Sequence, residues 1–209
     1  MRTKIGAFLV LTVLILLTSL SCGDGVDCGP FPSFFKVSGL EWELYEIELS
    51  SDQSRMIGNE RIEGNQVSFD KFAIGVFPDS ETYGWNNSVQ NFGLITVANA
   101  CSPAPPRSEE EIDNILITAN QDFNSNYPQG DNLAAIFDII VYDDSGNFNG
   151  ERLDLNTFLG MNPVVPYESY LLLKDQPNST TSFQFNVQFY IQGIDGDFFE
   201  FTTEEVVLE

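Results

Sequence analysis

Six oxygen-bearing side chains between residues 143 and 154 have the spacing of a calcium-binding loop. They occupy positions one, three, five, seven, nine and twelve, where such loops place their ligands. Position six is Phe148 instead of the glycine that the sharp turn needs, and position twelve is Asp154 instead of glutamate. The sequence therefore favours a hairpin loop between two strands over a calcium site and leaves weak calcium binding open. The six residues are Asp143, Ser145, Asn147, Asn149, Glu151 and Asp154.

Aromatic side chains form the second group that could bind a ligand. Tyr83 and Trp85 lie in a stretch rich in turn-forming residues. Exposed aromatic rings of this kind can pack against the apolar faces of sugars. Trp42 lies in a strand-like segment, where a core position is expected instead. The sequence thus gives Tyr83 and Trp85 as candidate ligand-stacking residues.

Composition excludes several chemistries. The 209 residues contain no histidine, so the commonest general base and metal ligand is missing. The formal net charge is −22, from 9 basic and 31 acidic residues, which argues against nucleic-acid binding. No nucleophile-elbow, zinc-protease, phosphate-loop or dinucleotide motif is present. We expect no enzymatic activity, no catalytic or metal-binding residue and no cofactor, although a pair of carboxylates in a cleft could still hydrolyse glycosides.

The N-terminus has the three parts of a secretory signal. Arg2 and Lys4 precede a stretch of thirteen mainly apolar residues, 5–17, and short polar residues then lead to Cys22. This stretch is too short to span a bilayer, which takes roughly 20 residues. The segment resembles a bacterial lipoprotein signal in the small residue before the cysteine, Ser21, and departs from that pattern two and three residues before it.

The resemblance implies that residues 1–21 are removed and that Cys22 carries acyl chains that bind the membrane. Gly23 then implies sorting to the outer membrane, on its periplasmic or surface face. The alternative is an ordinary secretory signal with Cys22 as a free thiol. An exported chain with two remaining cysteines predicts a disulfide between Cys28 and Cys101, with two free thiols as the alternative.

Short segments of alternating or continuous apolar residues predict a chain made of strands. In 183–191, Phe, Val and Ile alternate strictly with Asn, Gln and Tyr, which predicts one buried and one wetted face. We expect an all-β fold, a two-sheet β-sandwich of immunoglobulin-like or similar type over 34–209, joined to the anchor by 22–33. Two tandem domains divided near the prolines of 103–106 are the alternative. Further strands are predicted over 34–37, 40–49, 66–77, 92–98, 115–119, 137–142, 170–173 and 198–203.

Three connecting segments complete the prediction. Residues 78–87 are expected to form a loop because of their turn-forming composition. Residues 108–111, with three consecutive glutamates, are expected to form a solvated turn, and 195–196 a hairpin turn. Residues 153–159 suggest a short helix.

The mature region is similar to Bacteroidota lipoproteins with a domain of unknown function. The similar segments are 112–118, 122–124, Tyr127–Pro128 with Gly130, and 201–203. The resemblance implies an anchored β-rich domain and supplies no activity. The sequence thus predicts an envelope protein that binds a protein or glycan partner. A fimbrillin-like structural subunit or a carbohydrate-binding surface lipoprotein are the alternatives.

Overall fold

The computed structural model describes residues 34–83, 107–142, 149–193 and 197–209, and most of these residues lie in strands. The predicted strand 92–98 and the turn at 195–196 lie outside these ranges. No helix in the described ranges is long and apolar enough to cross a membrane. The strands are β1 (Phe34–Leu49), β2 (Met56–Arg61), β3 (Gln66–Val67), β4 (Phe72–Tyr83), β5 (Arg107–Ser108), β6 (Glu111–Ala119), β7 (Phe137–Tyr142), β8 (Asn149–Asp154), β9 (Glu168–Leu173), β10 (Thr181–Phe183), β11 (Phe185–Gln192), β12 (Phe198–Thr202) and β13 (Val206–Leu208).

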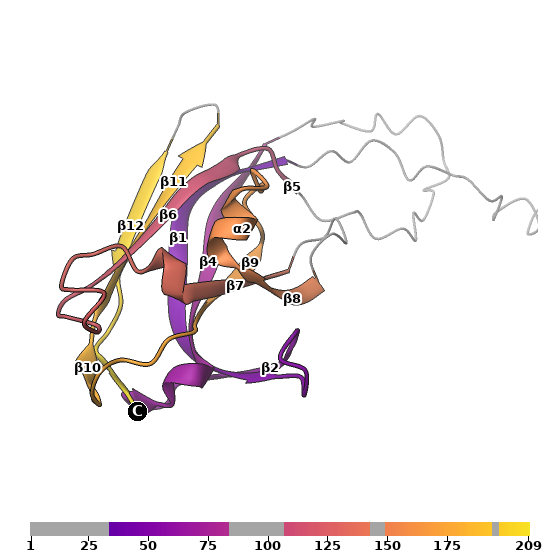
Figure 1. Ribbon diagram of the computed structural model, residues 1–209. Coiled ribbons are helices and arrows are strands. Elements are labelled where there is room, and N and C mark those ends of the chain that lie inside the picture. Colours follow the sequence, from indigo (N-terminus) through magenta and orange to yellow (C-terminus); the bar gives the residue numbers. More distant parts are fainter. Residues whose placement is uncertain (1–33, 84–106, 143–148, 194–196) are drawn as a thin grey trace, which may run out of the picture. The chain divides into compact units, whose positions relative to one another are not determined.

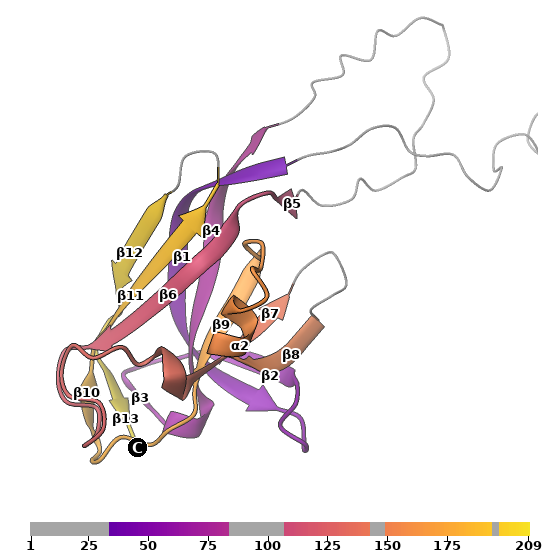
Figure 2. The ribbon, with the colours of Figure 1, turned by 45° about the horizontal axis from the view of Figure 1, so that its top comes forward.

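The strands form three sheets (Figure 1). The largest has seven strands, in the order β2-β1-β4-β9-β7-β8, with β5 added to β1. The other two have three strands each, β12-β11-β6 and β10-β13-β3. Most pairs are antiparallel, while β5 on β1 and β13 on β3 are parallel. Figure 2 shows β12, β11 and β6 running side by side.

The core lies between the faces of these sheets. Alternate residues of β4, among them Phe72 and Ile74, are fully buried in one apolar cluster with Phe185 and Val187 of β11. The strict alternation of 183–191 is confirmed, because the apolar side chains are buried and the polar ones between them lie at least partly in solvent. The predicted all-β, sandwich-type fold is therefore confirmed, with one side built from two small sheets.

This core takes residues from both sides of the proline-rich segment 103–106. Phe35 and Phe72 precede that segment, and Ile115 and Phe185 follow it in the same cluster. A smaller cluster covers the opposite face of the large sheet around Tyr170, with Ile47, Ala73, Ile140 and Leu172.

The prediction of a loop over 78–87 is wrong for residues 78–83, while 84–87 lie outside the described ranges. Strand β4 continues through Pro78 to Tyr83, paired with β1 along its whole length. On its other side, β9 pairs with β4 only from Ala73 to Val76. Pro78 therefore lies where β4 has a neighbour on one side only, and a proline without an N–H is tolerated at such a position.

The prediction of a solvated turn over 108–111 is also wrong. Ser108 and Glu110 are buried, and Glu110 is only 2% exposed. Its Oε2 accepts a hydrogen bond of 2.7 Å from the Val37 N–H. At Gly193, an added Cβ would lie 2.6 Å from the Glu110 Cγ, so glycine provides the space for this side chain. Nothing in the sequence indicated that Glu110, the middle one of three glutamates, is buried and binds the backbone of β1.

A group of charged residues joins β7, β8 and β9. The Asp138 carboxylate contacts the Arg152 Nε and, at 3.0 Å, the Lys174 Nζ. Lys174 also contacts Asp154 at 2.9 Å. Asp154 begins the helix α2 (Leu155–Leu159) by accepting a hydrogen bond from the Thr157 N–H. The short helix predicted over 153–159 is thus confirmed.

Asp154 is expected to contribute to acid sensitivity. The hydrogen bond from Lys174, followed by that from the Thr157 N–H, lowers the pKa of Asp154 to about 2 from 3.8. Because the folded pKa lies below the unfolded one, this contribution to stability is present above about pH 4 and is lost as the pH falls toward 2. Urea unfolding at pH 6 and pH 2.5 should therefore show a smaller acid loss in Asp154→Asn than in the wild type.

The matched control is Asp175→Asn, because Asp175 is exposed and has no ion pair with another described residue. This control should lose as much stability in acid as the wild type. Equal acid losses in Asp154→Asn and the wild type would contradict the assignment.

Candidate functional site

The residues singled out from the sequence are only partly placed by the structure. Cys22, Cys28, Cys101 and Trp85 lie outside the described residues. Tyr83 ends β4, opposite Phe34 of β1. The stacking pair Tyr83 and Trp85, the anchor and the disulfide therefore remain predictions.

The calcium-like segment joins two paired strands. β7 and β8 are antiparallel neighbours, which confirms the hairpin, while residues 143–148 lie outside the described ranges. Two of the six candidate ligands have other partners, since Glu151 contacts Arg55 at 3.1 Å and Asp154 caps α2. Within the described ranges, no group of three or more acidic or cysteine residues is placed to hold a metal ion.

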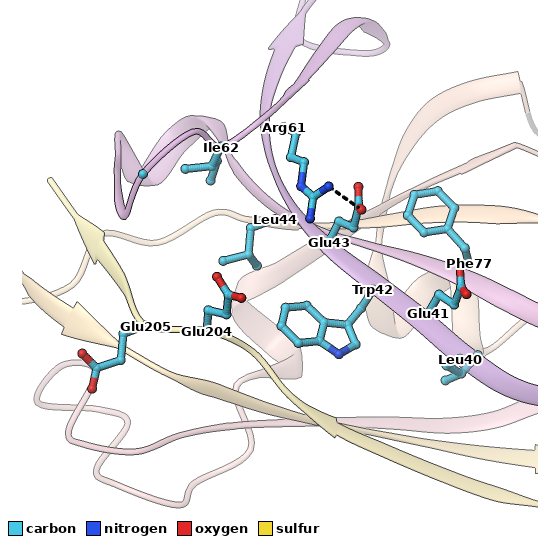
Figure 3. A pocket seen from close by; sticks show the side chains of 11 residues that line it. Leu40, Glu41, Trp42, Glu43, Leu44, Arg61, Ile62, Phe77, Glu204 and Glu205 are labelled. Atoms are coloured by element: carbon cyan, nitrogen blue, oxygen red, sulfur yellow. Dashed lines mark ion pairs between the residues drawn. The ribbon is translucent and has the colours of Figure 1, made fainter.

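A hollow of about 680 Å³ lies beside β1 and is the candidate site (Figure 3). One wall is the middle of β1, and the facing wall is the connection between β12 and β13. The connection between β2 and β3 closes one end. The lining residues are Leu40, Glu41, Trp42, Glu43, Leu44, Arg61, Ile62, Gly64, Phe77, Glu204 and Glu205.

Trp42 is the main aromatic side chain of the hollow. It is partly exposed, and its ring stacks on Phe201 of β12 with centroids 5.5 Å apart and planes 8° from parallel. The sequence predicted a core position for Trp42, because this residue lies in a strand-like segment. It lies instead at the border of the core, where β1 and β12 approach each other without pairing.

Negative charge dominates the hollow. Four glutamates, at 41, 43, 204 and 205, face a single cation, Arg61. Arg61 contacts Glu43 at 3.0 Å, and Glu43 also accepts a hydrogen bond of 2.9 Å from the Tyr45 hydroxyl. Burial and this hydrogen bond raise the pKa of Tyr45 to about 12, so its hydroxyl stays a neutral donor. Glu43 is therefore occupied, and Glu205 accepts a hydrogen bond of 3.2 Å from the Ser182 hydroxyl. Glu41, Glu204 and Glu205 form no ion pair with another described residue, so their carboxylates can attract a cationic ligand.

The edge of β1 is uncovered along this hollow. β2 pairs with β1 only from Tyr45 onward, and β5 only at Phe34 and Phe35. The Leu44 carbonyl accepts a hydrogen bond of 3.0 Å from the Ile62 N–H, so the peptide groups of Leu44 point away from β4. Along a strand, the N–H and C=O groups of every second residue point to the same edge of the strand.

The same direction therefore holds for Leu40 and Trp42, because the pairing of β1 with β4 has no shift between Gly39 and Leu44. Pro78, which lies opposite Leu40, is consistent with this direction, because a proline has no N–H that could bind the Leu40 carbonyl. The N–H and C=O groups of Leu40 and Trp42 thus face the open edge.

A second surface, the amide face, lies on the outer side of β11 and β12. It consists of Asn186, Gln188, Tyr190, Phe198 and Glu200. Tyr190 and Phe198 are 38% and 49% exposed, with ring centroids 5.1 Å apart. Glu200 Oε1 accepts hydrogen bonds of 2.9 Å from both Gln188 and Asn186, and these bonds lower the pKa of Glu200.

The amide face combines the rings of Tyr190 and Phe198 with the Glu200 carboxylate, which accepts hydrogen bonds from two side-chain amides. The sequence predicted that this side of 183–191 is wetted, but the partner residues on β12 become visible only through the pairing of Tyr190 with Phe198 and of Gln188 with Glu200.

Comparison with known proteins adds little. No family model and no curated protein matches the chain. Two solved chains match in structure. One is the C-terminal domain of the AgI/II polypeptide BspA of Streptococcus agalactiae, at 12% identity over 81% of this chain and a TM-score of 0.24. The match covers 49% of that chain, or about half its length. A similarity this low carries no argument about fold or function, so the site stands on its own geometry.

Proposed function

We propose that this protein is a lipid-anchored cell-envelope protein that works as a binding or accessory module, with the hollow beside β1 as its binding site. The observation that carries the proposal is the open hollow itself, in which a stacked tryptophan and three carboxylates without an ion pair to another described residue lie next to an uncovered strand edge. Concave surface regions of this size are typical places for a ligand to bind, and the charged lining here favours a ligand of opposite charge.

The N-terminal sequence supports the location. A basic start, a short apolar stretch and Cys22 are the features of a lipoprotein signal. Acyl chains on Cys22 would bind the protein to the outer membrane. The absence of histidine from the sequence supports a binding role in preference to catalysis.

Glycan binding at the amide face is the second candidate. Its support is the exposed Tyr190–Phe198 pair beside Glu200, because rings pack on sugar C–H groups while amides and carboxylates bind hydroxyls. Tyr83 and Trp85 remain the residues that the sequence predicts for carbohydrate binding, and the amide face is a second surface for it.

One experiment separates these functions. The full-length protein in detergent would be applied to glycan and peptide arrays, together with Trp42→Ala and Tyr190→Ala. We expect the strongest ligand of the wild type to bind at least tenfold more weakly to Trp42→Ala and equally well to Tyr190→Ala. Thermal unfolding of both variants checks that they are folded.

The reverse pattern would overturn the hollow as the site and support the amide face. Ligands that bind both variants as well as the wild type would overturn both assignments.

A further inference from the structure

We propose that the hollow binds an extended peptide segment bearing lysine or arginine, which adds to the edge of β1 as a further strand. The inference rests on the proposed function of the hollow and names the chemical class of its partner. It is carried by the peptide groups of Leu40 and Trp42 together with the carboxylates around them.

The open edge offers a defined set of hydrogen-bonding groups. Leu40 and Trp42 each present one N–H and one C=O, which is the repeat that a neighbouring strand needs. On both sides of this stretch the edge is occupied: β2 pairs from Tyr45 onward and β5 at Phe35. Glu110 binds the Val37 N–H. The chain thus covers the edge of β1 at both ends and leaves the part opposite the hollow open.

The charge of the hollow selects the partner. None of the ion pairs between described residues includes Glu41, Glu204 or Glu205. A cationic side chain on the added strand would meet these carboxylates at short range. A second copy of this chain has a formal charge of −22 and would be repelled. A neutral glycan has neither the charge nor the regular peptide groups that this edge requires.

The side chains of β1 also favour an alternating peptide. Leu40 and Trp42 lie on one face of the strand, where they pack beside the core, and Glu41 lies on the other. A strand beside β1 would place its own side chains on these two faces in turn. A sequence that alternates apolar and basic residues therefore fits the hollow best.

The test uses three fluorescent peptides with the full-length protein in zwitterionic detergent. The first alternates lysine and valine, the second alternates glutamate and valine, and the third is the first with N-methyl groups on alternate peptide bonds. We expect the first to bind and the other two to bind at least tenfold more weakly in fluorescence anisotropy. Hydrogen exchange at the Leu40 and Trp42 amides should slow at least tenfold with the first peptide.

Matched variants test the charge. The double change Glu204→Lys and Glu205→Lys should weaken binding of the lysine peptide at least tenfold, while Asp175→Lys, which alters an exposed acid outside the hollow, should leave it unchanged.

Several results would overturn the inference. Equal binding of the N-methylated peptide would mean attraction by charge without strand addition. Absent binding of the lysine peptide, unchanged exchange at Leu40 and Trp42, or self-association through this edge would also overturn it. A different ligand that is lost in Trp42→Ala while these peptides fail would leave the proposed function intact. If Trp42→Ala bound every ligand as well as the wild type does, the proposed function of the hollow would be overturned as well.

Discussion

Replacing Cys22 with serine is expected to move nearly all of the protein from the membrane fraction to the soluble fraction. If acyl chains on Cys22 are the anchor, each buried CH₂ contributes about 0.8 kcal/mol, and two or more chains make dissociation negligible. Serine provides no thiol for this attachment. Ultracentrifugation of cell lysates, with immunodetection of the protein, measures the change, and mass spectrometry of the N-terminal peptide measures the lipid.

Cys28→Ser is the matched control, since it makes the same chemical change six residues further along the chain. We expect this variant to remain in the membrane fraction. A Cys22→Ser protein that stays with the membrane, or an uncleaved and unmodified N-terminus, would contradict the lipoprotein assignment.

Phe185→Ala is expected to cause the largest loss of stability, about 3–5 kcal/mol in the free energy of unfolding. Phe185 is fully buried, and its ring lies 5.5 Å from that of Phe72 and 6.0 Å from those of Phe137 and Phe183. These neighbours belong to three different strands, so they cannot close around the space left by the ring. Urea unfolding of the two proteins under the same conditions gives the difference.

Phe198→Ala is the matched control, because it removes the same phenyl group from an exposed position instead of a buried one. Phe198 is 49% exposed on the amide face, and its removal should cost less than about 1 kcal/mol. Similar losses at the two positions would show that Phe185 is not the centre of the core.

The strands were the most predictable part of the fold, because alternation is a local property of the sequence. Residues 183–191 show a strict period of two, and the structure buries every apolar member of that set. The errors arose where a residue depends on distant neighbours. Pro78 is accepted in a strand because β9 stops pairing at Val76, and Glu110 is buried because Val37 needs an acceptor.

The candidate site was less predictable for the same reason. The hollow combines the middle of β1 with Arg61 and with Glu204, residues that meet only through the arrangement of the sheets. The sequence pointed to Tyr83 and Trp85, because aromatic residues beside turn formers are the local sign of a stacking site. Trp42 gave no such sign, because its partial exposure follows from the missing pairing between β1 and β12.

The parallel pairing of β13 with β3 has a consequence for biosynthesis. Val207 and Leu208 pair with Gln66 and Val67, and the Phe69 N–H donates to the Glu209 carbonyl. The sheet β10-β13-β3 therefore cannot form until the ribosome has released residues near 208, and such distant pairings slow folding. If the protein is exported, as its N-terminal sequence predicts, this delay helps to keep the chain unfolded for translocation, while its unburied phenylalanines make it prone to aggregation.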